Sequence, residues 1–172
     1  MAGNRGADGE ELNVLVLGVG NVLLADEGVG PKVIDLINAS YNSHGGVEFV
    51  DGGTMGFDLL PYLDDRSHLI VIDAVNTGKG AGETVRMVLD NPASFFSTMV
   101  SPHQLGLGEV FGVAAMTDNL PPSIVAIGVE PASLETSIDL SPDVQRKVPE
   151  LIQMVVDELG SLGIRLIPVS DA

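Results

Sequence analysis

The chain has 172 residues, of which 45% are hydrophobic and 19% charged, and its formal net charge is −16. This length and composition indicate a globular protein with a sizeable core and exclude an intrinsically disordered chain. The acidic balance would repel nucleic acid and anionic lipid, so we expect neither as a partner, whereas a basic protein surface would be attracted. The absence of cysteine excludes disulfides, cysteine-based zinc sites and thiol nucleophiles.

Residues 1–12 are small, polar and rich in glycine, which predicts a flexible leader before a single domain over residues 13–172. No apolar run reaches the length of a secretory signal core or a membrane span. We therefore expect a cytoplasmic protein that does not insert into membranes.

Short apolar runs separated by helical patterns predict the fold. Three runs are typical of buried strands: 14–19, 68–72 and 124–129. The run 47–50 predicts a further short strand, and 84–89 alternates like a half-exposed edge strand. A last run, 164–167, could close the domain. Helices are expected over about 30–42, 57–63, 101–116 and, as one long helix, from Ser141-Pro142 onward. This alternation predicts a three-layer α/β domain, with a mostly parallel sheet of about five strands and helices on both faces.

Three side chains that can bind metal or transfer protons fall at the predicted carboxyl edge of this sheet. Glu27 precedes the first helix, Asp73 follows the strand over 68–72, and His103 lies in the first turn of a helix that Pro102 opens. In an open parallel sheet, the functional crevice lies outside the carboxyl ends of the strands. Two carboxylates and one imidazole suit a divalent metal with open coordination positions. The sequence therefore predicts a metal-binding or catalytic site formed by Glu27, Asp73 and His103.

Each of these residues also has a structural interpretation. Glu27 could be a carboxylate that a helix dipole stabilises, and Asp26 a capping or supporting residue. Asp73 could cap a turn after its strand, although an acid beside a buried strand needs a partner or a ligand.

His103 has Gln104, Gly106 and Gly108 as neighbours, which leaves little side-chain bulk on that face. His44 and His68 are expected to have no role in the site.

The segment Asp51-Gly52-Gly53-Thr54 follows the second predicted strand. Two consecutive glycines permit a positive φ and expose backbone N–H groups to a ligand, so the segment could form a rim of the site that receives substrate. Alternatively, it is a tight turn in which Thr54 caps the next helix. The chain contains no G-x-S-x-G motif, which leaves nucleophilic serine catalysis without support.

The glycine-rich loop after the first strand raises the alternative of nucleotide binding. In a G-x-G-x-x-G pattern that starts at Gly18 and Gly20, the third glycine would fall at Leu23. The following helix also begins too late, and Asp26 and Glu27 would repel a pyrophosphate. The loop is better explained as a turn, shaped by Asn21, that carries the two acids over the strand ends.

Taken together and in order, these motifs resemble the nickel–iron hydrogenase maturation endopeptidases. The resemblance covers nearly all of 13–168 and rests on 18–30 (GVGNVLLADEGVG), 51–54 (DGGT), Asp73, 101–107 (SPHQLGL) and 128–135 (GVEPASLE). It implies an aspartic-type endopeptidase that removes the C-terminal peptide from the hydrogenase large-subunit precursor after nickel insertion.

The resemblance also assigns roles to the candidate residues. Glu27, Asp73 and His103 would be the ligands that detect nickel, and 51–54 (DGGT) the segment that receives the substrate chain. Catalysis could be assisted by a metal near the scissile peptide, or Glu27 or Asp73 could act as general base, and the sequence does not choose between these routes. Nickel would be supplied by the substrate, with no tightly bound resident metal, and the absence of H-E-x-x-H agrees with this. The expected partner is the large-subunit precursor, and the protein is expected to be a monomer.

Three other interpretations stay open at this point. The same three residues could bind nickel and hand it on in a non-catalytic metallochaperone. The second is a small nucleotide-binding module, and the third is an enzyme that keeps its own metal and hydrolyses small amides.

Overall fold

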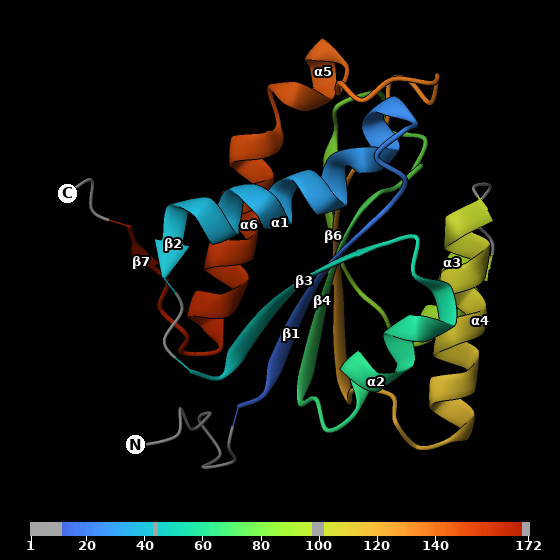
Figure 1. The fold of residues 1–172 in the computed structure, drawn as a ribbon, viewed down its shortest axis with the longest axis vertical. Helices are drawn as coiled ribbons and strands as arrows, with labels where there is room; N and C mark the ends of the chain where they lie inside the picture. Colours follow the sequence, from blue (N-terminus) through green and yellow to red (C-terminus); the bar gives the residue numbers. More distant parts are fainter. Residues whose placement is uncertain (1–11, 43–44, 98–101, 170–172) are drawn as a thin grey trace.

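The computed structural model describes residues 12–42, 45–97 and 102–169 (Figure 1). Residues 1–11 of the predicted leader lie outside this part of the chain, as does His44, and Leu12 is buried in the core. Among the described helices, none is long and apolar enough to cross a membrane.

A five-stranded, mostly parallel sheet forms the centre of the molecule, as the sequence predicts. Its strands lie in the order β3-β1-β4-β6-β5, and only β5 runs antiparallel to its neighbour. The strands are β1 (Val14–Val19), β3 (Val47–Gly53), β4 (His68–Ala74), β6 (Ser123–Val129) and β5 (Thr84–Val88). The central strands β1, β4 and β6 are almost wholly buried because helices cover both faces of the sheet.

Helices form a layer on each face of the sheet (Figure 1). One hydrophobic cluster joins the sheet to α1 (Val29–Ser40), α5 (Pro142–Gln145) and α6 (Val148–Ser161). A second cluster joins the opposite face to α2 (Leu60–Leu63), α3 (Pro92–Ser97) and α4 (Pro102–Met116). Two short 3₁₀ helices, η1 (Ala25–Gly28) and η2 (Gly56–Leu59), precede α1 and α2. This arrangement confirms the predicted three-layer fold.

Several predicted element boundaries were wrong, for identifiable reasons. The first helix ends at Ser40, because Tyr41–Asn42 forms strand β2 and pairs with β7 (Ile167–Pro168) in a separate two-stranded sheet. The run 164–167 therefore does not extend the main sheet. The predicted C-terminal helix is divided into α5 and α6, since Pro149 has no N–H to donate to the carbonyl of Gln145.

Glycines allow α1 to start against the ends of β1 and β4. A Cβ on Gly30 would lie 2.3 Å from the carbonyl oxygen of Val19 and 2.4 Å from that of Ile72, and one on Gly18 would lie 2.4 Å from the carbonyl oxygen of Gly30. These are contacts with backbone atoms, which cannot rotate away. The beginning of α1 is therefore seated directly on two adjacent strands.

This seating predicts that Gly30→Ala lowers the free energy of unfolding by about 3 kcal/mol, because overpacking against backbone forces the helix off the sheet. Gly160→Ala is the matched control, since nothing lies within 4 Å of its added Cβ and it occupies α6. Urea unfolding should show the control to be as stable as the wild type or slightly more stable. A Gly30→Ala variant with an unchanged midpoint would contradict the tight contact.

Candidate active site

Two buried carboxylates lie where the strand order of the sheet reverses. The chain passes from β1 to β3 on one side of β1, and β4 lies on its other side, so the switch point falls between β1 and β4. Glu27 belongs to η1, which follows β1 and packs against β4, and Asp73 is the penultimate residue of β4. Only 4% of Glu27 and 1% of Asp73 are exposed. This is the position at which open α/β sheets bind their ligands.

Gly20 lies against the backbone of Glu27 and near the carboxylate of Asp73. A Cβ on this residue would lie 1.8 Å from the carbonyl oxygen of Glu27 and 3.7 Å from Oδ1 of Asp73. Its φ of 131° is also one that side-chain-bearing residues rarely adopt. The glycine loop thus brings η1 against the end of β4, which agrees with the prediction that it forms a turn. Asn21 shapes that turn, because its Oδ1 accepts a hydrogen bond of 3.0 Å from the N–H of Leu23.

The carboxylate of Asp73 is held in one orientation by hydrogen bonds to both of its oxygens. The N–H of Ala74 donates to Oδ1 at 2.8 Å, and Nε2 of Gln104 donates to Oδ2 at 2.9 Å. The same Nε2 donates to the carbonyl oxygen of Ala74 at 2.7 Å. Asp73 therefore lies within β4 and not in a turn after it, and its own carboxylate binds the next backbone N–H.

Gln104 is a residue whose role the sequence analysis did not identify. It is buried in the first turn of α4, and its amide ties that helix to the end of β4. The signal was present in the sequence, because an amide directly after His103 in a helix start offers two donors to a neighbouring strand end.

His103 lies next to Gln104 in the first turn of α4, as predicted, and its side chain is outside the described part of the structure. Among the side chains that are described, no group of three or more acidic or histidine residues is arranged to hold a metal ion. His68 begins β4, where burial lowers the pKa of its imidazole although Glu158 opposes the shift.

The glycines near His103 have different environments. A Cβ on Gly108 would lie 2.9 Å from the N atom of Ser97 and 3.1 Å from the carbonyl oxygen of Ala93, so this glycine lets α4 approach α3. A Cβ on Gly106 would meet no atom within 4 Å. Close helix–helix packing therefore accounts for Gly108 only.

Asp26 ties η1 to the loop after β6. It is 0% exposed; its Oδ2 accepts from the N–H groups of Ala132 and Ser133 at 2.8 and 2.9 Å, and its Oδ1 accepts from the N–H of Ser141 at 2.7 Å. Between these anchors, the N–H of Ala25 donates to the carbonyl oxygen of Ser137. The expectation that Asp26 is a supporting residue is confirmed, although its partners lie more than 100 residues away.

Glu130 ties a second loop to the end of β6. Its Oε2 accepts hydrogen bonds from the N–H and hydroxyl of Thr77 and from the N–H of Lys79. Burial of Glu130 acts to raise its pKa, but these bonds and one from the N–H of Gly80 outweigh it, so the pKa lies below the ordinary value of 4.5. The carboxylate form therefore holds the loop over 76–83 at the edge of the sheet.

The segment 51–54 begins inside β3, which continues to Gly53. Oδ1 of Asp51 accepts from the N–H of Gly53 at 3.0 Å, and the carbonyl oxygen of Gly53 accepts from the N–H of Gly20, also at 3.0 Å. The segment thus adjoins the glycine loop that holds Glu27. The interpretation of Thr54 as a helix cap was wrong, because Met55 precedes η2 and no side chain caps it.

Comparisons with known proteins agree with the geometry. Residues 31–158 match the family model for hydrogenase maturation proteases. The chain is 37% identical over 158 residues to the hydrogenase 2 maturation protease of Escherichia coli K12, covering 91% of this chain and 96% of that one. The hydrogenase expression/formation protein HupD of Rhodobacter capsulatus is 37% identical over 155 residues, covering 89% and 74% of the two chains. The solved structure of the hydrogenase maturating endopeptidase HybD from Escherichia coli superposes with a TM-score of 0.88 at 36% identity, covering 94% of this chain and all of that one.

The chain belongs to the hydrogenase maturation protease family. It is therefore a hydrogenase maturation endopeptidase, and the resemblance drawn from its motifs is confirmed.

This maturation protease has a pocket of about 140 Å³ between α1, the end of β3 and the loop before α5, and Gly28, the residue after Glu27, is part of its lining. Apolar side chains from the glycine loop, α1 and the later loop line it, together with three acids and one lysine. These charged residues are Asp35, Asp51, Asp139 and Lys32. The pocket therefore combines apolar walls with a net negative charge.

Asp26→Asn should lower the free energy of unfolding by about 3 kcal/mol, because three N–H groups lose a charged acceptor and one of them faces an amide donor. Asp139→Asn is the control, since Asp139 is an exposed acid in the same loop. Urea unfolding measures the loss, and limited proteolysis should cut the Asp26→Asn variant faster between residues 131 and 141. A loss as small as that of the control would contradict the anchoring role.

Glu130 predicts a pH-dependent contribution to stability. Because its folded-state pKa is lowered, its hydrogen bonds stabilise the fold above the ordinary carboxyl pKa of 4.5, and this stabilisation is lost as the pH falls through the folded-state value. The wild type should therefore have a higher melting temperature than Glu130→Gln near pH 7, and the difference should shrink below about pH 4.5. Melting curves from pH 7 to pH 3, with Glu135→Gln as an exposed control, would test this; a difference that stays constant with pH would refute it.

Proposed function

We propose that this protease removes the C-terminal peptide from the precursor of a hydrogenase large subunit after nickel has been inserted, and that nickel in the substrate is the recognition element. The observation that carries the proposal is the pair of buried carboxylates, Glu27 and Asp73, at the switch point of the sheet of a maturation protease. Hydrolysis of a peptide bond needs a polarised carbonyl or an activated water. A carboxylate can activate water as a general base, and it can bind a metal ion that polarises the carbonyl.

In this proposal Glu27 and Asp73, together with His103 from the first turn of α4, contact the nickel ion that the precursor carries. Oxygen and imidazole ligands suit a divalent ion of this kind, and the ligands present leave coordination positions to the substrate. A precursor without nickel would bind poorly, because it brings no cation to the buried carboxylates. Nickel belongs to the substrate, and no tightly bound resident metal is required.

Two routes for the chemical step are compatible with these residues. Nickel near the scissile bond could polarise its carbonyl or lower the pKa of the attacking water. Alternatively, Glu27 or Asp73 takes a proton from that water as general base. In both routes Gln104 acts as a positioning residue, because its amide fixes Oδ2 of Asp73. Segment 51–54 would receive the substrate chain, since it adjoins the glycine loop beside Glu27.

The intact mass of a matched, nickel-loaded precursor tests the proposal. Wild type should release a C-terminal peptide from it and leave the nickel-free precursor whole. Glu27→Gln and Asp73→Asn should lower kcat/KM by about 100-fold or more, the usual cost of losing a positioned acid–base group. Glu109→Gln, an exposed conservative change on α4, is the control and should cut like the wild type.

A loaded precursor that binds but keeps its mass would overturn the proteolytic step. If nickel then passed between the two proteins, the metallochaperone interpretation would replace it. Cleavage of nickel-free precursor at the same rate would instead contradict recognition through nickel.

A further inference from the structure

The outer edge of β3 has backbone groups that no other described residue uses. β3 is the edge strand of the sheet, and its register against β1 runs from Val14–Val47 to Gly18–Asp51. The N–H of Val14 donates to the carbonyl oxygen of Gly46, so residues 46, 48 and 50 direct their backbone groups to β1. The N–H and C=O groups of Val47, Phe49 and Asp51 consequently face away from the sheet, and no hydrogen bond to them is formed within the described part of the chain.

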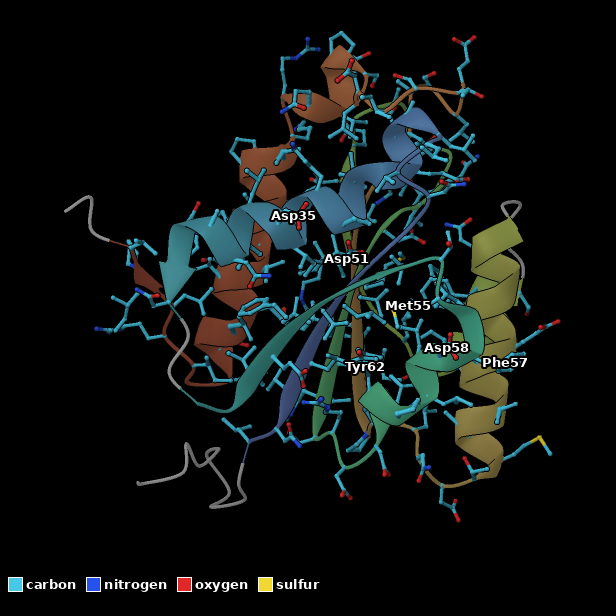
Figure 2. The ribbon with its side chains drawn as sticks, viewed as in Figure 1. Asp35, Asp51, Met55, Phe57, Asp58 and Tyr62 are labelled. Atoms are coloured by element: carbon cyan, nitrogen blue, oxygen red, sulfur yellow. The ribbon has the colours of Figure 1, made fainter. Side chains whose placement is uncertain are left out.

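This edge is open in the folded molecule. In Figure 1, β3 crosses the front of the molecule between α1 and α2, and no helix passes over it. Figure 2 shows Asp35 on one side of the strand and Met55, Asp58 and Tyr62 on the other. Natural proteins usually cover or disrupt an exposed edge strand, because its unpaired backbone groups invite another chain. An open edge beside an active site is therefore a candidate for substrate binding.

The edge also leads directly to the buried carboxylates. β3 ends at Gly53, whose carbonyl oxygen is bonded to Gly20, and Gly20 lies against Glu27 and close to Asp73. An extended chain bound along β3 would therefore be directed toward the candidate active site. Such strand addition gives affinity through main-chain hydrogen bonds and specificity through pockets for alternate side chains.

We propose that an extended segment of the precursor binds as an added strand on the outer edge of β3, with a basic side chain in the pocket beside Asp51. This rests on the proposed function and names how its substrate is held. The pocket suits a lysine or arginine: Val22, Pro31 and Ile138 would cover the aliphatic stem, and Asp35 and Asp51 would meet the charged head. Exposed Phe57 and Met55, on the other side of β3, offer apolar contacts to side chains that point the opposite way.

Charge favours a substrate segment over a second copy of this chain as the occupant. Edge-to-edge pairing of two copies would bring Asp35, Asp51 and Asp58 of one against the same acids of the other. Each copy carries a formal net charge of −16, so the association would also be opposed at long range. A segment with lysine or arginine side chains replaces that repulsion with attraction.

Proline substitution tests the backbone contribution. Proline is tolerated on an edge strand where the N–H faces outward, so Phe49→Pro should fold while losing one donor to the added strand. Phe49→Ala is the matched control, since it loses the same ring and keeps the N–H. We expect Phe49→Pro to raise KM for the nickel-loaded precursor at least tenfold over Phe49→Ala, with a similar kcat. Val47→Pro and Val47→Ala form a second pair, so that a folding defect at one position leaves the other to decide.

Amide hydrogen exchange gives a readout that is independent of turnover. With the Glu27→Gln variant saturated by the loaded precursor, the amides of Val47, Phe49 and Asp51 should exchange at least tenfold more slowly. The amides of Glu48 and Val50 should change little, because they are already bonded to β1. Unchanged exchange at all three outward positions at saturation would overturn strand addition.

Other results separate this inference from the proposed function. If wild type cuts the precursor and both proline variants match their alanine controls, strand addition is wrong and the proteolytic function stands. If wild type neither binds nor cuts it, both fail together. Protection of the outward amides that appears without precursor and grows with enzyme concentration would assign the edge to a dimer of this chain.

Discussion

The backbone contact between the start of α1 and the ends of β1 and β4 positions the whole candidate site. With glycine at positions 18 and 30, helix and strand backbones meet without intervening side chains. The four residues of η1 are thereby held over the switch point, and Glu27 is buried there together with Asp73. Any side chain at these positions would move α1 away from the sheet and take one carboxylate with it.

This close approach has a local cost that neighbouring loops offset. Ala25 has a φ of 45°, in a region that residues other than glycine seldom adopt. Its N–H is bonded to the loop after β6, and the adjacent Asp26 anchors both ends of that loop through three backbone N–H groups. Asp26 and Glu130 act in the same way, since each has a buried or nearly buried carboxylate that accepts hydrogen bonds from backbone N–H groups. The acids around the site therefore divide into those that hold loops and those that can face a ligand.

How much of this could be predicted from the sequence depended on how local each signal is. The apolar runs of β1, β4 and β6 are continuous and buried, so their limits were predicted within two residues. Hydrogen bonds between distant segments leave no such local pattern. From the sequence alone, Asp26 is only an acid at the start of a helix, because its partners at 132, 133 and 141 are known only from the structure. The pairing of β2 with β7 and the lengthening of β3 through Gly53 are likewise set by tertiary neighbours. Pro149 did carry a local signal for dividing the last helix, and the apolar spacing on both sides of it outweighed that signal.

If nickel is the recognition element, the burial of Glu27 and Asp73 explains how an acidic protease could distinguish loaded from empty precursor. Both side chains are almost fully buried at the switch point of the sheet, so a charge brought to them is screened little by solvent. A loaded precursor would bring a divalent cation to these two acids, whereas an empty precursor would bring none. Strand addition along β3 would supply affinity that is the same for both forms. Discrimination would then come from the side chains proposed to contact nickel, Glu27, Asp73 and His103, so that the precursor is held by its backbone and selected by its metal.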